Sequence, residues 1–274
     1  MRHACTQVSA ALTVLVAVGA GAAQPAKPPF PYVWAKAYHI PPETTTEESG
    51  YFSLCEGKDG RVYVGCAAYG RDSYLVEFDP KTEKMKVVLD THKLVGLPLE
   101  PTGYAAQSKI HTRNFVGPSG TIYLGSKQGY PTAEEKKTGK VATYRGGYVM
   151  TYDPATGKAK NLGMPMPLDD KRQPKGAKEG EGVIDVVADE SRGLVYVITC
   201  EHQHWMLFDT KHPEKGYRDL GPLLRDQPNT LIDRQGRATR DGPPAAGFPA
   251  LPLGKGVPHP ARDHHRRVRL LLPL

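Results

Sequence analysis

Three histidines in the sequence carry the side chain that most often binds divalent metals in proteins. His202 and His204 stand two positions apart, so an extended backbone would place both imidazoles on one side. His111, from an earlier part of the chain, would supply a third ligand, and Glu201 lies beside the pair. The spacing therefore predicts a divalent metal held by His111, His202 and His204. The alternative interpretation is that the pair are ordinary loop residues.

A polar triplet, formed by Gln107, Lys109 and His111, alternates along one predicted strand. Alternate residues of a strand point to the same side, so these three side chains would line one surface. An amide, an ammonium and an imidazole together can bind an anionic or hydroxyl-rich small molecule. The alternative interpretation is a hydrogen-bonded structural histidine with two solvated neighbours.

A long insertion at 127–146 adds Tyr130 and Arg145 to the candidate ligand-binding residues. Loops of this length are usually functional or disordered. The insertion is interpreted either as a lid over the polar triplet or as plain disorder. In an up-and-down sheet of four strands, the start of the first strand and the loop between the second and third strands lie at the same edge. We therefore expect His111, the insertion and the segment 201–204 to share one face.

The elements that must position these residues come from a threefold internal repeat. Each unit has a strand with a central tyrosine, which is Tyr63, Tyr123 or Tyr196, preceded by a turn that contains glycine. Each unit continues through a loop into a strand that ends in an aromatic residue and an aspartate. Short segments rich in Val, Ile, Tyr and Phe between Gly, Pro and Asp are typical of strands and turns.

Completing each unit to four strands predicts three antiparallel sheets with almost no helix. The predicted strands are 51–55, 61–66, 74–78 and 84–89; 109–116, 121–126, 147–152 and 158–162; and 183–188, 194–199, 204–208 and 216–220. Consecutive four-stranded units are the blades of a β-propeller. The predicted fold is thus an all-β propeller over 51–240, with about three complete blades and a fragment, which leaves the ring incomplete.

The strand Asp-Gly-x-Val-Tyr at 59–63 and the turn Tyr-Asp-Pro-x-Thr-Gly at 152–157 resemble exported bacterial propellers of the NHL-repeat, gluconolactonase-like and streptogramin-lyase-like families. The resemblance concerns architecture, because propellers of this kind include lactonases, lyases and binding modules. It implies an exported propeller that binds a small molecule or glycan or serves as an interaction scaffold. The alternative is a metal-assisted lyase or hydrolase acting on sugar-like or lactone substrates.

No local catalytic motif decides between these functions. The sequence has no nucleophile elbow, phosphate-binding loop, His-Glu-x-x-His or Cys-x-x-Cys motif. Catalytic residues drawn from separate blades leave no such motif, so whether the chain is an enzyme stays open.

The first 23 residues have the pattern of a secretory signal peptide, with Arg2, an apolar run at 10–18 and small residues at 20–22. We therefore expect an exported protein, in the periplasm or outside the cell. Residues 24–50 would lead into the blades, and the mature chain would have no transmembrane segment.

The mature chain would keep three cysteines, Cys55, Cys66 and Cys200. Cys55 and Cys66 flank one predicted turn and could lie on neighbouring strands, but spacing alone does not establish the geometry of a disulfide. Buried free thiols are the alternative.

The net charge of +7 belongs mainly to the two ends of the chain, and residues 25–244 carry only +2. A nucleic-acid-binding domain would carry its basic excess on the fold, so no nucleic acid partner is expected.

A fourth unit begins at 229–238, and the repeat then stops. The segment 241–274 is rich in proline and arginine and shows no strand alternation. We expect an irregular tail that follows a loss of the reading frame near 240; a tail that binds polyanions or a membrane surface is the alternative.

Overall fold

The computed structural model describes residues 35–46, 53–96, 103–173 and 175–222, together with the backbone of 230–232 and 238–240. The chain divides into two compact units, Met1–Tyr38 and His39–Leu274. Only residues 35–38 of the first unit are described, so the fold reported below is that of the second.

The first sheet is an antiparallel meander with strand order β1-β2-β3-β4. Its strands are β1 (Leu54–Glu56), β2 (Val62–Gly65), β3 (Tyr74–Asp79) and β4 (Lys84–Asp90). The turn between β1 and β2 contains Gly60 at φ 74°, a left-handed conformation that glycine adopts without strain. A 3-10 turn, η1 (Pro42–Thr44), precedes the sheet, and the short helix α1 (Thr91–Val95) follows it.

The second sheet differs from the sequence prediction at its first strand. The predicted strand 109–116 is divided into β5 (Lys109–Ile110) and β6 (Phe115–Val116), which both pair with β7 (Ile122–Lys127). Between them Asn114 has φ 50°, and the Thr112 hydroxyl accepts a hydrogen bond from the backbone N–H of Gly125. A side chain thus replaces a backbone partner at the break. The sheet is completed by β8 (Val149–Asp153) and β9 (Lys158–Asn161).

The insertion after β7 contains a short helix, α2 (Ala133–Thr138). Thr132 and Glu135 form a capping box at its start, which satisfies two backbone N–H groups reciprocally. The Glu135 carboxylate also accepts a hydrogen bond from the backbone N–H of Tyr104 at 2.9 Å. These contacts fasten the insertion to a second loop, which favours a folded segment over plain disorder.

The third sheet repeats the meander with strand order β10-β11-β12-β13. Its strands are β10 (Gly182–Asp189), β11 (Leu194–Cys200), β12 (His204–Asp209) and β13 (Tyr217–Pro222). The 3-10 turn η2 (Pro213–Lys215) joins β12 to β13. Beyond it, β14 (Thr230–Ile232) pairs antiparallel with β15 (Ala238–Arg240), where a fourth unit was expected to begin.

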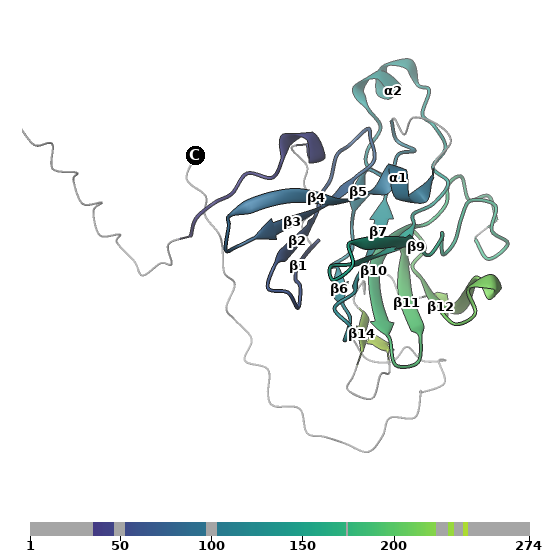
Figure 1. The fold of residues 1–274 in the computed structure, drawn as a ribbon. Helices are drawn as coiled ribbons and strands as arrows, with labels where there is room; N and C mark the ends of the chain where they lie inside the picture. Colours follow the sequence, from purple (N-terminus) through teal and green to yellow (C-terminus); the bar gives the residue numbers. More distant parts are fainter. Residues whose placement is uncertain are drawn as a thin grey trace, which may run out of the picture. The chain divides into compact units, whose positions relative to one another are not determined.

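The core consists of two clusters of buried side chains, each between consecutive sheets (Figure 1). Along β7, Ile122 and Leu124 join the cluster that includes Tyr63 of the first sheet. Tyr123 joins the other cluster, which includes Val183 of the third sheet. Successive residues of a strand point to opposite faces, so the middle sheet contributes to both cores.

Glycine at one repeat position allows the sheets to approach each other. Gly65 and Gly125 each stand two residues after the central tyrosine of the unit. A Cβ at Gly65 would lie 2.6 Å from Cγ2 of Ile110, and one at Gly125 would lie 2.2 Å from Cγ1 of Val183. Both separations are far below van der Waals contact, so each glycine makes room for the first strand of the next sheet.

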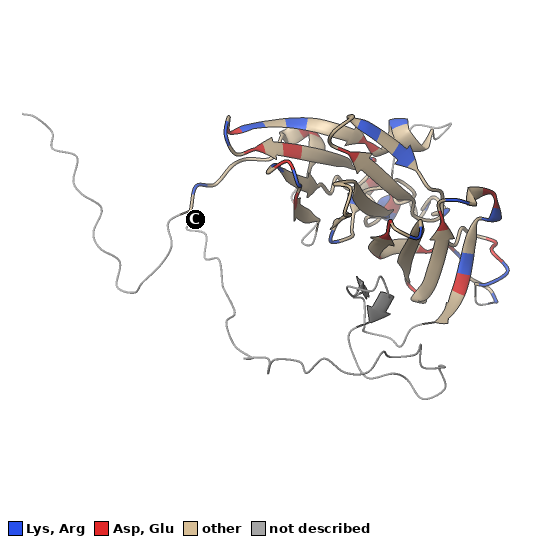
Figure 2. Cartoon of the chain, turned by 60° about the horizontal axis from the view of Figure 1, so that its bottom comes forward, with Lys and Arg blue, Asp and Glu red and all other residues tan. Residues whose placement is uncertain are grey.

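The prediction of an all-β chain built from antiparallel four-stranded units is confirmed, with one strand divided in two. Among the described residues no sheet closes on itself. Within the same residues, no helix has the length and apolar character needed to cross a bilayer. Figure 2 shows basic and acidic residues mixed along the strands rather than gathered by sign. The expected leader 1–23 and tail 241–274 lie outside the described residues.

Candidate functional site

A buried lysine, Lys109, and a half-buried lysine, Lys127, lie opposite each other where β5 pairs with β7. In the register of this pair, Lys109 is directly opposite Lys127. Lys109 is 8% exposed, and the side chain of Lys127 is 16% exposed. Like charges directly opposite each other on neighbouring strands destabilise a sheet, and burial adds the cost of removing each ammonium from water. Because this arrangement lowers the stability of the fold, we consider it a candidate functional site.

Two tyrosines lie next to the ammonium of Lys109. Its Nζ lies 5.3 Å from the ring centre of Tyr69 and 5.5 Å from that of Tyr130, within the range of cation–π attraction. The Tyr69 hydroxyl is 3.5 Å from the same Nζ. Burial and the charge of Lys127 lower the pKa of Lys109. The ammonium of Lys109 is thus held in place without a full counter-charge.

Lys127 contacts the end of β11, in the third sheet. Its Nζ lies 2.9 Å from Oε1 of Glu201 and 2.6 Å from Sγ of Cys200. Burial acts to lower the pKa of Lys127, but the two neighbours outweigh it and the pKa is raised. Burial in turn raises the pKa of the Cys200 thiol, and Lys127 opposes this rise. Lys127 therefore stays an ammonium with one close carboxylate.

His111 lies beside the two lysines and is neutral at physiological pH. Burial, followed by the charges of Lys109 and Lys127, lowers its pKa to about 4. A neutral imidazole can donate one hydrogen bond and accept another. We refer to Lys109, His111, Lys127, Tyr69, Tyr130, Cys200 and Glu201 together as the lysine site.

Gln107 supports the lysine site through its hydrogen bonds. Its Oε1 accepts a hydrogen bond from the Ser126 hydroxyl at 2.7 Å, and its Nε2 donates to the carbonyl of Gly146 at 2.9 Å. Its backbone N–H donates to Oδ1 of Asp72 at 2.6 Å. With its amide used in this way, Gln107 anchors the start of β5 and the end of the insertion.

Of the two insertion residues singled out from the sequence, one reaches the lysine site. Tyr130 lies over Lys109, and its ring is 61% exposed and packs edge-on against Tyr69 at 5.3 Å. Arg145 is exposed and pairs with exposed Asp169 at 3.3 Å. The structure therefore assigns Arg145 to a surface ion pair rather than to the lysine site.

The paired histidines are turned toward separate carboxylates. Nδ1 of His202 lies 2.5 Å from Oε1 of Glu181, and Nδ1 of His204 lies 2.8 Å from Oδ2 of Asp219. The backbone is not extended here, because Gln203, which stands between the two histidines, has φ 54°. The alternation that would place both rings on one side therefore does not apply.

Among the described residues, no group of three or more His, Cys, Asp and Glu side chains is arranged to hold a metal ion. The metal site of His111, His202 and His204 stays a prediction without support from this arrangement. The same is true of a metal-assisted reaction.

The three cysteines among the described residues are free thiols. Cys66 and Cys200 are buried and Cys55 is half-buried, so the structure has no link between Cys55 and Cys66. Burial raises the pKa of Cys66 to about 11 and that of Cys55 to about 12. These two thiols are therefore protonated and poorly reactive at neutral pH.

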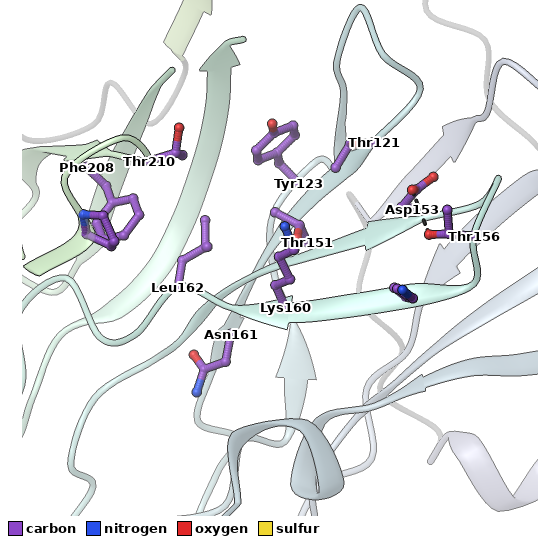
Figure 3. A pocket seen from close by; sticks show the side chains of 12 residues that line it. Thr121, Tyr123, Thr151, Asp153, Thr156, Lys160, Asn161, Leu162, Phe208 and Thr210 are labelled. Atoms are coloured by element: carbon purple, nitrogen blue, oxygen red, sulfur yellow. Dashed lines mark hydrogen bonds between the residues drawn. The ribbon is translucent and has the colours of Figure 1, made fainter. Parts of the chain in front are cut away.

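A separate groove lies elsewhere on the fold (Figure 3). It has a volume of about 740 Å³ and is lined by residues of β8, β9 and β12, among them Thr151, Lys160 and Phe208. None of its lining residues belongs to the lysine site.

The sequence analysis missed Lys127, Cys200 and Tyr69 as members of the lysine site. Lys127 could be found only from the register of β5 and β7, since 18 positions of the chain separate it from Lys109. Cys200 comes from a different sheet. Gly182 lies between the two, and a Cβ there would be 2.7 Å from Cγ of Lys127. Because Gly182 has no side chain, the stem of Lys127 can pass over it to reach Cys200.

No protein-family model and no curated protein matches the chain. Among solved structures, the extracellular domain of BT4673 from B. thetaiotaomicron aligns with 15% sequence identity and a TM-score of 0.40, over 68% of this chain and 19% of that chain. A second structure of the BT4673 domain gives 16% identity and a TM-score of 0.39, with the same coverage. A protein that carries the name gluconolactonase aligns with 13% identity and a TM-score of 0.26, over 68% of this chain and 69% of that chain. The chain therefore spans about a fifth of the length of the BT4673 structures.

Proposed function

We propose that this chain is an exported binding protein of propeller architecture, and that its lysine site holds a small anionic molecule of the class of sugar acids and sugar phosphates. The observation that carries the proposal is the pair formed by buried Lys109 and half-buried Lys127, which are opposite each other in register. A negatively charged group between them would offset their mutual repulsion and add to the partial counter-charge that Glu201 provides.

The propeller architecture is supported by the order and packing of the sheets. The three meanders follow one another along the chain, and each packs on the next through a buried cluster. The glycines Gly65 and Gly125 repeat the same close contact at both junctions. A propeller has about four to eight blades, so a closed ring would need units beyond the three complete ones. Export is supported by the signal-peptide pattern at 1–23.

The carbohydrate class is supported by the tyrosines of the lysine site. Small-molecule sites are lined by aromatic side chains together with a few convergent polar groups. Tyr130 is exposed and packs edge-on against Tyr69, so an exposed aromatic ring lies beside Lys109. Neutral His111 adds a donor and an acceptor for a hydroxyl. An anionic group on a hydroxylated ring matches this combination of side chains.

A thermal-shift panel of matched acidic and neutral sugars tests the proposal. Glucuronate and glucose 6-phosphate would be compared with glucose, because each pair differs by the anionic group. A ligand that binds only the folded state raises the melting temperature by mass action. We expect a concentration-dependent rise with at least one acidic sugar and no rise with glucose.

Two matched variants complete this test. Lys109→Met should abolish the rise, whereas Lys160→Met, which removes an exposed lysine far from the site in the sequence, should keep it. Equal shifts with glucose and its acids, or a full response in Lys109→Met, would refute the proposed function.

A further inference from the structure

Lys127 donates a hydrogen bond to Cys200. Their Nζ and Sγ atoms are 2.6 Å apart. The two atoms are therefore near enough to be joined through one small bridging atom.

The surroundings of the pair hold the two side chains in this position. Cys200 ends β11 and is 9% exposed, and Lys127 ends β7. Lys127 reaches across the bare backbone of Gly182, where a Cβ would collide with its stem. Oε1 of Glu201 lies 2.9 Å from the amine and 3.6 Å from the thiol. A proton acceptor is therefore within reach of both groups.

We propose that Lys127 and Cys200 form an oxidative cross-link in which one oxygen atom bridges Nζ and Sγ, with a peroxide as the oxidant. The S–H bond and one N–H bond of the neutral amine break, and an N–O and an S–O bond form. Sulfur and nitrogen each lose two electrons, and two hydrogen peroxide molecules accept all four. One peroxide oxygen becomes the bridge, and the other three leave as water. The proton that the ammonium first releases passes to Glu201 or to solvent.

The cross-link has a consequence that rests on the proposed function. An amine bonded to oxygen is a much weaker base than a lysine side chain, so Lys127 would lose its positive charge. Lys109 would then be the single cation of the lysine site, and anionic sugars would bind more weakly. Reduction by a thiol would restore the amine and the thiol, which makes the link a reversible switch.

Intact-mass spectrometry of the full chain before and after peroxide tests the cross-link. We expect a gain of one oxygen less two hydrogens, lost again on treatment with dithiothreitol, and a linked peptide that contains Lys127 and Cys200. Because the thiolate is the nucleophile that attacks the peroxide oxygen, the reaction should be faster at alkaline pH. Cys200→Ser and Lys127→Arg should both lack this mass, and Cys66→Ser should keep it.

Other masses would overturn the inference. A gain of one whole oxygen means simple oxidation of the thiol, and a loss of two hydrogens alone means a direct S–N bond. The same mass gain in folded Cys200→Ser would place the link elsewhere. Binding of the acidic sugar is measured separately on the cross-linked and reduced protein. A cross-link that forms without weakening binding would contradict the proposed function and leave the cross-link itself established.

Discussion

Replacing Lys109 by methionine should stabilise the fold while it removes anion binding. A buried ammonium costs several kcal/mol even after relaxation, and an opposed like charge such as Lys127 adds about 0.2–1 kcal/mol. The cation–π contacts with Tyr69 and Tyr130 return about 0.5–2 kcal/mol each. The lowered pKa of Lys109 indicates that the unfavourable effects are the larger ones.

Methionine keeps most of the stem volume of lysine and carries no charge. We therefore expect the free energy of unfolding to rise by about 1 kcal/mol in Lys109→Met. For a chain of this size, a change of this kind corresponds to a melting temperature about 2–4 °C higher. Urea denaturation followed by circular dichroism at neutral pH measures the difference, with Lys160→Met as the control.

The pH dependence provides an independent check of the same effect. The pKa of Lys109 in the folded protein is below the ordinary 10.5, so the folded state binds fewer protons than the unfolded state between these two values. The stability of the natural protein relative to Lys109→Met should therefore increase as pH rises toward 10.5. A variant that is less stable than the natural protein at neutral pH would refute the reasoning, because Lys109 would then be a stabilising residue.

Three further predictions concern other parts of the fold. The pKa of His111 is lowered to about 4 from the ordinary 6.5, so the free energy of unfolding should fall by about 3 kcal/mol as the pH drops through this range. Chemical denaturation at pH 6.5 and pH 4 should show a smaller fall in His111→Gln. An equal fall in this variant would contradict the lowered pKa of His111. Gly125→Ala should lower the free energy of unfolding by about 2–3 kcal/mol, because the added Cβ would overlap Val183. Gly157→Ala has open space around the added Cβ but φ 66°, so it should cost about 1 kcal/mol. Equal losses in chemical denaturation would rule out the close approach of Val183 to Gly125. Arg145→Ala should leave both stability and sugar-acid binding unchanged, since it removes only an exposed ion pair. Weaker sugar-acid binding in titration calorimetry would show instead that Arg145 belongs to the lysine site.

The strands could be predicted from the sequence because local chemistry determines them. Alternating apolar residues around Tyr63, Tyr123 and Tyr196, with glycine and aspartate turns between them, led to strand ranges close to those observed. The division of the strand 109–116 was not visible, because it depends on the left-handed backbone of Asn114 and on the Thr112 hydroxyl, which acts as a backbone partner.

The lysine site could be predicted only in part. Lys109 and His111 were among the candidates because they alternate along one predicted strand, and Tyr130 was included because it lies in a long insertion. Gln107 stays a prediction as a ligand-binding residue; it precedes β5, and its amide is hydrogen-bonded to Ser126 and Gly146. Lys127 depends on strand register, which no local pattern of residues reveals.

The measurement that tests the lysine site most directly is the titration of the Nζ group of Lys109 by NMR. Its signal would be assigned from Lys109→Met and followed with and without a saturating acidic sugar. The predicted midpoint for the free protein is below 10.5, and it should rise when the ligand binds, because a nearby anion favours the ammonium form. A midpoint at or above 10.5 in the free protein, or one that a bound acidic sugar leaves unchanged, would contradict an anion site at Lys109.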